Sequence, residues 1–382
     1  MEPSLTVRSL RPFLWPAVLV FVATVAYAAR VQHHMVDFAV YRQAAERALA
    51  AEPLYRGEDG HYQFKYLPAF AFAMAPFALL PDAAARAVWF ALSVALLVVL
   101  VRWSIRALPG RRLSVRALGW LTILFLGKFY ANELNLGQTN ILLGVLLLGA
   151  LLAVQAGRTA LAGALVGAGI FVKPYAVILL PWLLVASNVS AVLVAGGILV
   201  AGLALPVAVY GLQGAFDELV AWFITVTGTS PPNLLVAENI SIATMWAKWV
   251  GPGALATGLA VATAGAAIGA AALVVRRRHA SEEPAYLEFG LLMLLVPLLS
   301  PQGWDYVLLL ATPAVILLFD RLGTLARPWR VVTVIALAGM GLTIFDVLGR
   351  ALYSSLMRVS VVSVCALVLV ASLARLRWQG SA

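Results

Sequence analysis

Charged residues are scarce in this sequence: they make up 12% of its 382 positions, whereas 63% of the positions are hydrophobic. Soluble domains carry about twice that share of charge. Apolar runs recur along the whole length, and no shift in composition marks a separate soluble domain. We therefore predict an all-α polytopic membrane protein that forms one transmembrane domain over residues 1–382.

Cysteine and histidine are also scarce. The single cysteine, Cys365, lies in an apolar run, so no intrachain disulfide can form. Among the four histidines, His33 and His34 are neighbours and cannot share one helix face, and no third ligand is spaced to join them. No glycine-rich loop follows a strand-like segment, as a nucleotide donor would require. We expect no metal and no cofactor.

The net charge of +10 does not indicate a nucleic-acid partner. The arginines stand in short clusters beside hydrophobic runs, which is the pattern of cytoplasmic loops in membrane proteins. Membrane lipids are the surroundings that this pattern implies. The acidic residues fall mainly in the loops on the opposite side, which also favours a cytoplasmic position for the arginine-rich loops.

Twelve apolar runs are candidate membrane spans. With both termini in the cytoplasm, the arginine clusters all fall on the cytoplasmic side, and the large outer segments are 30–83 and 211–253. The first run follows Arg8 and Arg11 and ends in small residues, as a signal peptide does, but we favour a retained helix. The predicted spans are 13–29, 84–101, 117–131, 139–156, 159–172, 175–187, 190–210, 254–275, 286–299, 304–319, 330–346 and 356–374.

Two segments leave the span count open. The spans on either side of Lys173-Pro174 are short for a bilayer of about 30 Å, and one kinked helix is the alternative. The apolar segment 66–80 is interrupted by Pro68 and Pro76. We favour a helix on the outer surface for this segment, because a span here would move the arginine-rich loop 102–116 to the outer side.

A carboxylate, Asp37, follows the first predicted span and directly precedes an amphipathic stretch, 38–50. This stretch is predicted to form a helix on the outer interface. One interpretation makes Asp37 the N-cap of that helix. The other makes it a general base that faces a cavity between the helix and the bundle.

Further polar residues gather at the predicted outer ends of other spans, where polar groups are candidates for function. The amides in "NELNLGQTN" suit hydroxyl-rich ligands, although a polar turn explains them equally well. Lys173 either pairs with an anion such as phosphate or extends to the interface. In "SPQGWDY" an aromatic ring beside a carboxylate can stack on a sugar and bond to it. The alternative is an interfacial aromatic anchor with a helix cap. The candidates are Lys65, Asn135, Gln138, Asn140, Lys173, Asn239, Ser241, Ser300, Trp304, Asp305 and Tyr306.

The chain resembles glycosyltransferase family 87, which has the GT-C membrane fold. The resemblance rests on "DFAVYRQAAERALAAEPLY", "FKYLP", "LNLGQTNILL", "GALVGAGIFVKP", "NISI" and "LLSPQGWD", in this order. It implies that Asp37 is the catalytic base and that the polar residues above, with Tyr41 and Tyr66, lie near the donor or acceptor. Two features depart from the family: a single Pro68 replaces paired prolines, and Asp305 is followed by Tyr306 and Val307 where one or two histidines are usual after the tryptophan.

The resemblance implies an inverting, metal-independent glycosyltransferase of the cell envelope, active on the extracytoplasmic face of the plasma or inner membrane. It would transfer a hexosyl group, preferably mannosyl, from a polyprenyl-phosphate sugar to a glycolipid or glycan acceptor. An arabinofuranosyltransferase of the same family is the alternative enzyme. A lipid-linked sugar transporter or flippase is the alternative outside enzymes, but it predicts polar residues at the bilayer midplane. A structural membrane subunit would leave the polar outer clusters unexplained.

Overall fold

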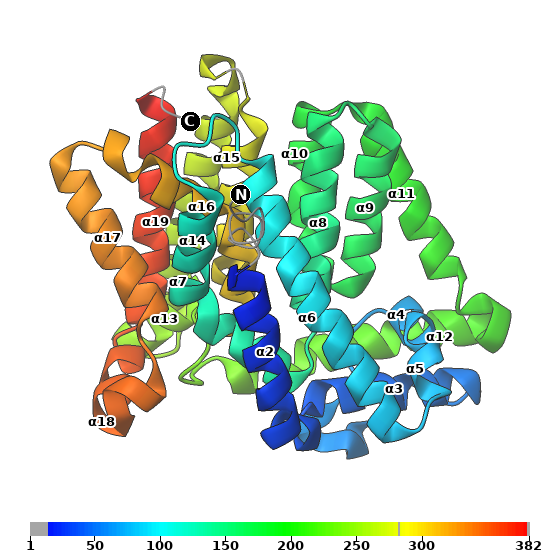
Figure 1. Ribbon diagram of the computed structural model, residues 1–382. Helices are drawn as coiled ribbons and strands as arrows, with labels where there is room; N and C mark the ends of the chain where they lie inside the picture. The colour runs from blue at the N-terminus through cyan, green and yellow to red at the C-terminus, as the bar shows by residue number, and fades with distance from the viewer. Residues whose placement is uncertain (1–13, 282, 380–382) are drawn as a thin grey trace, which may run out of the picture.

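The computed structural model describes residues 14–281 and 283–379 (Figure 1). This part of the chain is helical and contains no strand; its one β-like contact is a bridge between Asn239 and Trp304. The all-α prediction is confirmed. The predicted cytoplasmic residues Arg8 and Arg11 lie outside the described residues.

Every predicted span coincides with a helix, and consecutive members of this set run in opposite directions between the upper and lower ends of the bundle in Figure 1. Two of them begin with a 3-10 turn, η4 (Pro174–Ile178) before α10 and η7 (Asp305–Ala311) before α16. The set is α2 (Leu14–Ala29), α6 (Asp82–Ala107), α7 (Val115–Leu136), α8 (Asn140–Gln155), α9 (Thr159–Val172), α10 (Leu179–Ala186), α11 (Val189–Ala204), α14 (Ala254–Arg276), α15 (Ala285–Leu299), α16 (Thr312–Arg321), α17 (Arg327–Gly341) and α19 (Val361–Trp378).

Helix length supports a membrane protein but does not establish twelve spans. Within the described residues, five helical segments are long and apolar enough to cross a membrane, or up to seven if two bent pairs each count as one span. Others are short: α9 has 14 residues, or about 21 Å, against a hydrocarbon core of about 30 Å. The twelve-span count and the GT-C fold therefore stay predictions.

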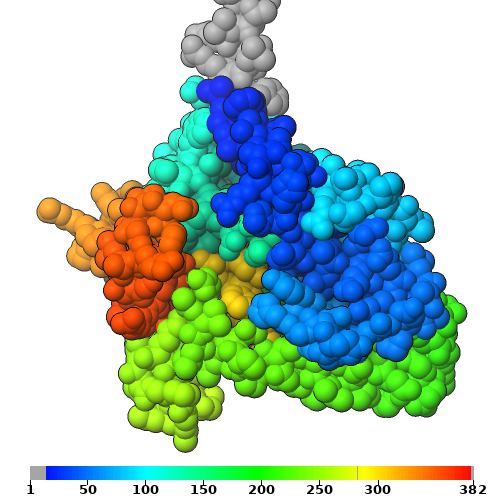
Figure 2. All heavy atoms as spheres, turned by 90° about the horizontal axis from the view of Figure 1, so that it is seen from below, coloured from blue at the N-terminus to red at the C-terminus, as the bar shows by residue number. Residues whose placement is uncertain are grey.

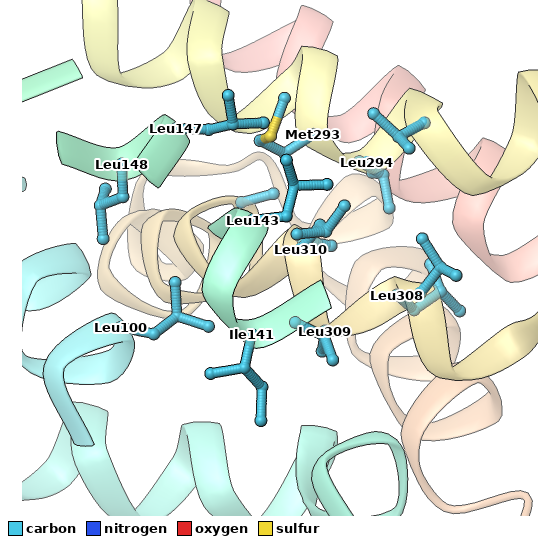
Figure 3. Close-up of a cluster of buried hydrophobic side chains, with 14 of the residues drawn as sticks. Leu100, Ile141, Leu143, Leu147, Leu148, Met293, Leu294, Leu308, Leu309 and Leu310 are labelled. Atoms are coloured by element: carbon cyan, nitrogen blue, oxygen red, sulfur yellow. The ribbon is translucent and has the colours of Figure 1, made fainter. Parts of the chain in front are cut away.

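The core of the bundle is made of leucine-rich helix faces (Figure 3). Leu100 of α6, Leu143 and Leu147 of α8, Met293 of α15 and Leu310 of η7 are all buried. Elsewhere small residues let backbones approach closely. At Gly163 of α9, an added Cβ would lie 2.1 Å from the carbonyl oxygen of Ala191 in α11. Such contacts are typical of helices that pack within membranes.

The predicted amphipathic helix is present as α3 (Val36–Leu49), but its start differs from the prediction. Met35 occupies the N-cap position with a left-handed φ of 28°, and Asp37 lies inside the first helical turn. The N-cap interpretation of Asp37 is therefore wrong. Since Met35 N donates to the carbonyl oxygen of Asn135, the tertiary contact with the end of α7 decides where α3 begins.

The segment 66–80 forms two short helices, α4 (Pro68–Ala73) and α5 (Ala75–Ala78), and neither is long enough to span. Pro68 and Pro76 lie in the first turns of these helices, where the missing N–H is tolerated. Both helices pack beside α3 at the lower end of the bundle (Figure 1).

The chain reverses direction at Lys173-Pro174. Lys173 is extended, with φ −152° and ψ 125°, and separates α9 from η4. After α10, the side chains of Ser187 and Asn188 both lie 3.4 Å from Oγ1 of Thr159, at the start of α9. The chain has thus returned to the end of the bundle from which α9 departed. The alternative of one kinked helix is wrong.

The two long outer segments predicted from the sequence contact each other at the lower end. Helix α12 (Val207–Thr229) crosses this end of the bundle in Figure 1 after a break at Gly211. The carboxylate of Glu218 accepts from Leu54 N at 3.2 Å and 3.4 Å, and Trp222 Nε1 donates to the carbonyl oxygen of Lys65. Helix α18 (Phe345–Arg358) lies at the same end, bent 103° from α17.

Candidate active site

Gln138 joins four segments of the chain at the lower end of the bundle. Its Oε1 atom accepts hydrogen bonds from Tyr41 of α3 at 3.0 Å, Tyr66 at 3.2 Å and Lys173 Nζ at 3.1 Å. Its Nε2 atom donates to the hydroxyl of Tyr306 at 3.2 Å. These five residues were all predicted from the sequence as candidates, and the structure brings them together.

The turn between α7 and α8 explains why Gln138 can occupy this position. Gly137 ends α7 in the left-handed region, with φ 70° and ψ 34°, and the chain bends by 120° into α8. A Cβ at Gly137 would lie 2.8 Å from Cβ of Phe38. Trp89 Nε1 donates to the Gly137 carbonyl oxygen at 2.9 Å. Glycine at this position therefore allows α3 to pack directly against the turn.

Asp37 lies beside this group. It is half-buried, and its burial raises the pKa of its carboxyl above the usual range. The positive charges of Lys173 and Lys65 and the nearby amide of Gln138 favour the ionised form and oppose this shift. Its position in the first turn of α3 also favours the negative charge. The Asp37 carboxylate therefore lies at the edge of the polar group around Gln138, and the charges of Lys173 and Lys65 act on it.

Lys173 is the cation within hydrogen-bonding distance of this group. Its ammonium lies 5.5 Å from the ring centroid of Tyr66 and 5.9 Å from that of Tyr175. Burial lowers the pKa of Lys173, while the nearby carboxylates of Glu133 and Asp37 favour its charged form. Lys173 has an extended backbone and forms the link between α9 and η4. From this position its side chain reaches Gln138.

Sequence reasoning missed Glu133 and Tyr175 as site residues. Asn140 Nδ2 donates to Glu133 Oε2 at 2.8 Å, and Ile141 N donates to its Oε1 atom at 3.1 Å. Tyr175 donates to Asn140 Oδ1 at 2.5 Å. Asn140 is therefore held at both ends of its amide and positions its neighbours. The signal for Glu133 was its place in "NELNLGQTN", where a carboxylate follows an apolar run and precedes the candidate amides.

Other predicted residues lie around this group or apart from it. Trp304 stacks on Tyr306, with ring centroids 6.5 Å apart and planes 5° apart. Asn135 contributes its backbone carbonyl to Met35. The Asp305 side chain is buried, and its Oδ1 atom has no hydrogen-bond partner in the described part of the chain. The charges of Lys128 and Glu238 act on the Asp305 carboxyl.

Asn239, Ser241 and Ser300 are not brought to Gln138. The Asn239 amide donates to the carbonyl oxygens of Asn233 and Pro301, and Ser241 caps helix α13 (Ile242–Val250). Ser241 and Ser300 line a mostly apolar cavity of 280 Å³ beside α13, α14 and α15. A binding role for these residues stays a prediction.

The lower face of the molecule is hollowed at its centre (Figure 2). The gold segment near residue 300 is visible inside the hollow, between the blue chain of the first outer segment and the green and orange segments that face it. Within residues 14–281 and 283–379, no group of three or more His, Cys, Asp or Glu side chains could hold a metal ion.

Comparison with protein families gives one match over more than half of the chain. The model of glycosyltransferase family 87 matches residues 64–301, which include Tyr66, Gln138 and Lys173 but not Asp37 or Tyr306. A search of curated proteins gives no match.

Proposed function

The chain belongs to glycosyltransferase family 87, and from this premise we propose that it transfers a mannosyl group from a polyprenyl-phosphate donor to a glycolipid or glycan acceptor. The observation that carries the proposal is the group around Gln138, where Lys173 bonds to the Gln138 amide and its positive charge acts on the Asp37 carboxylate. In this proposal the Asp37 carboxylate accepts a proton, and the Lys173 ammonium stabilises a phosphate.

In the proposed reaction, Asp37 takes the proton of an acceptor hydroxyl while that oxygen forms a bond to the anomeric carbon of the donor sugar. The bond from this carbon to the phosphate oxygen breaks, and the lipid phosphate leaves with the electron pair. Because attack and departure occur on opposite faces, the anomeric configuration inverts. A positioned base of this kind accelerates a reaction by about 10²–10⁴-fold.

Lys173 stabilises the negative charge that grows on the departing phosphate oxygen, an electrostatic effect that is large where water is excluded. Gln138 fixes the position of the ammonium and of the tyrosine hydroxyls of Tyr41, Tyr66 and Tyr306. The reaction requires no metal in this proposal, since Lys173 supplies the positive charge.

We place the reaction on the extracytoplasmic face. The arginine-rich loops lie at the upper end of the bundle in Figure 1, and the group around Gln138 lies at the lower end. The positive-inside rule assigns the arginine-rich end to the cytoplasm. A lipid-borne donor can meet a water-exposed acceptor at the opposite end.

The test is a transfer assay with purified protein in lipid nanodiscs. Radiolabelled polyprenyl-phosphate mannose and polyprenyl-phosphate arabinofuranose are supplied separately, with an envelope lipid extract as acceptor. We expect mannosyl transfer by the wild-type protein and a rate lower by about 10²–10⁴-fold in Asp37→Asn. Transfer of arabinofuranose alone would assign the other sugar, and full activity of Asp37→Asn would remove Asp37 from the mechanism.

A further inference from the structure

A second polar hollow lies on another face of α3. It is a cavity of 520 Å³, within the range of about 300–1,000 Å³ that is typical of small-molecule sites. Its wall combines α3 with the start of α6 and one residue of the 3-10 segment η3 (Gly57–Tyr62). The polar lining residues are His34, Arg42, Gln43, Glu46, Tyr62, Asp82 and Arg86.

The helix α3 separates this cavity from the group around Gln138. Tyr41 is buried and bonds to Gln138, whereas Gln43 is exposed and lines the cavity. Asp37 and Gln43 are six residues apart, which is about 9 Å along a helix axis. Because the lining also includes His34 and Val36 at the start of α3, a ligand with several units can extend from the cavity past this end of the helix toward Asp37.

The charges in the cavity are balanced. Asp82 accepts from Arg86 Nε at 2.7 Å and lies 3.7 Å from Arg42. Arg42 also pairs with Glu46 at 3.1 Å. Two guanidinium groups thus face two carboxylates. This balance disfavours a phosphate as the ligand and favours a neutral one.

The same groups retain free hydrogen-bonding capacity. The carboxylate side chains of Asp82 and Glu46 line the hollow and are 52% and 46% exposed, so a ligand can reach them. The exposed amide of Gln43 adds a donor and an acceptor. The cavity therefore offers both donors and acceptors at fixed positions.

The apolar part of the lining is small. Val36, Ala39 and Val40 come from one face of α3, and the ring of Tyr62 is 53% exposed. Short aliphatic groups and an exposed ring pack against the C–H faces of a sugar, while amide and paired charged groups bond its hydroxyls. A lipid chain would require a larger apolar surface than this cavity has.

We propose that this cavity binds neutral sugar units of the acceptor that are remote from the hydroxyl that attacks. This inference rests on the proposed glycosyl transfer, which supplies a glycan acceptor. In this proposal α3 lies between two sites: the base Asp37 is on one side of the helix, and the acceptor glycan binds on the other. The cavity would then select acceptors by length, because a single sugar cannot reach both sites.

The test measures binding without catalysis. Mannose, mannobiose and mannotetraose are added to the full-length protein in nanodiscs, and contact is followed by saturation-transfer NMR. We expect mannotetraose to bind better than mannose. Gln43→Ala and Tyr62→Ala should each weaken binding by about three- to tenfold, the effect of losing one hydrogen bond or ring contact. The matched control is Gln213→Ala, an exposed glutamine of α12 outside the cavity.

Asp37→Asn separates this proposal from the proposed function. Oligosaccharide binding that persists in Asp37→Asn and falls in Gln43→Ala supports the subsite, whatever the transfer assay gives. Equal binding by wild type, Gln43→Ala and Tyr62→Ala overturns it, as does the absence of oligosaccharide binding to wild type. Inorganic phosphate and anionic lipid vesicles are tested as alternative ligands. Binding of either one at this cavity, lost in Gln43→Ala, together with no binding of mannotetraose, would identify a headgroup site and overturn the proposal too.

Discussion

The ammonium of Lys173 lies 3.1 Å from the amide oxygen of Gln138 and joins the link after α9 to the start of α8. The same amide oxygen accepts from two tyrosines, so one side chain fixes a cation and two hydroxyls. In the proposed reaction this contact determines where the leaving phosphate is stabilised. The predictions below follow from this group and from the packing that supports it.

The rate of transfer should increase with pH as Asp37 loses its proton. Burial raises the pKa of Asp37 above its usual value of about 3.9, so the midpoint of this increase should lie above that value. In Asp37→Asn, kcat/KM should fall by about 10²–10⁴-fold, and the increase should disappear. The measurement is a pH profile of kcat/KM for both proteins. An unchanged acid limb in the variant would contradict the assignment.

The same pKa shift predicts a change in stability. Since the folded-state pKa of Asp37 is raised, the ionised group destabilises the fold at neutral pH. Asp37→Asn should therefore have a higher melting temperature than wild type at pH 7. The difference should shrink as pH falls through the folded-state pKa and vanish below the unfolded-state value, where the group is protonated in both states. Thermal unfolding across this pH range measures it.

Substitutions at Lys173 and Glu133 should separate the effect of Lys173 on activity from its effect on stability. Lys173→Met removes the charge that faces the leaving phosphate, and we expect kcat to fall by at least tenfold. It also leaves buried Glu133 without its nearby cation, which lowers stability. The double variant Glu133→Gln/Lys173→Met should recover stability but not activity. Recovery of activity would show that Lys173 acts only by neutralising Glu133.

The pair of Arg47 and Asp59 should stabilise the first outer segment. The two side chains are 9% and 12% exposed, and they form two hydrogen bonds of 2.5 Å and 2.7 Å. Asp59→Asn should lower the free energy of unfolding by about 2 kcal/mol, between the effects for exposed and buried pairs. Because Arg47 lowers the pKa of Asp59, this stabilisation should be lost as pH falls below the usual carboxyl range.

The control for this pair is Arg56→Ala. Arg56 pairs with Glu52 at 2.5 Å, but the two side chains are 29% and 52% exposed. We expect a change of no more than about 1 kcal/mol, as for other surface pairs. Chemical unfolding in detergent compares the two variants. Equal effects would show that burial of the Arg47 pair has no energetic consequence.

Helix packing predicts opposite results for two glycine substitutions. Gly163→Ala places a methyl group 2.1 Å from the Ala191 carbonyl oxygen, so α9 and α11 must separate, at a cost of about 1–3 kcal/mol. Gly197→Ala adds the same group where nothing lies within 4 Å. It should be neutral or stabilising by up to about 1 kcal/mol, because alanine favours helix. Melting temperatures of both variants test this contrast.

The sequence predicted the helical segments well because hydropathy is a local property. Each of the twelve apolar ranges became a helix, and the amphipathic stretch became α3 with a start two residues earlier. The reversal at Lys173 was left open, since a short apolar run beside a proline fits a kink or a turn equally well. Only the contact of Asn188 with Thr159 decides between them.

The candidate site was predictable in part. Gln138, Lys173 and Tyr306 came from the predicted outer ends of spans, Tyr41 and Tyr66 came with the family resemblance, and the five do converge. Their pairing could not be predicted, because Tyr41 and Gln138 are 97 residues apart and meet only through the turn at Gly137. Asn239 and Ser241 are polar for a local reason: they bond to the loop and cap α13.

The bond between Glu218 and Leu54 links α12 to the first outer segment across 164 residues of sequence, and Tyr210 repeats the link through the carbonyl oxygen of Glu52. These bonds join the two segments, so we expect a movement of one to displace the other. Admission of a bulky lipid-linked sugar past them would demand a concerted motion of both, so a crosslink at this junction would trap the enzyme in a single state.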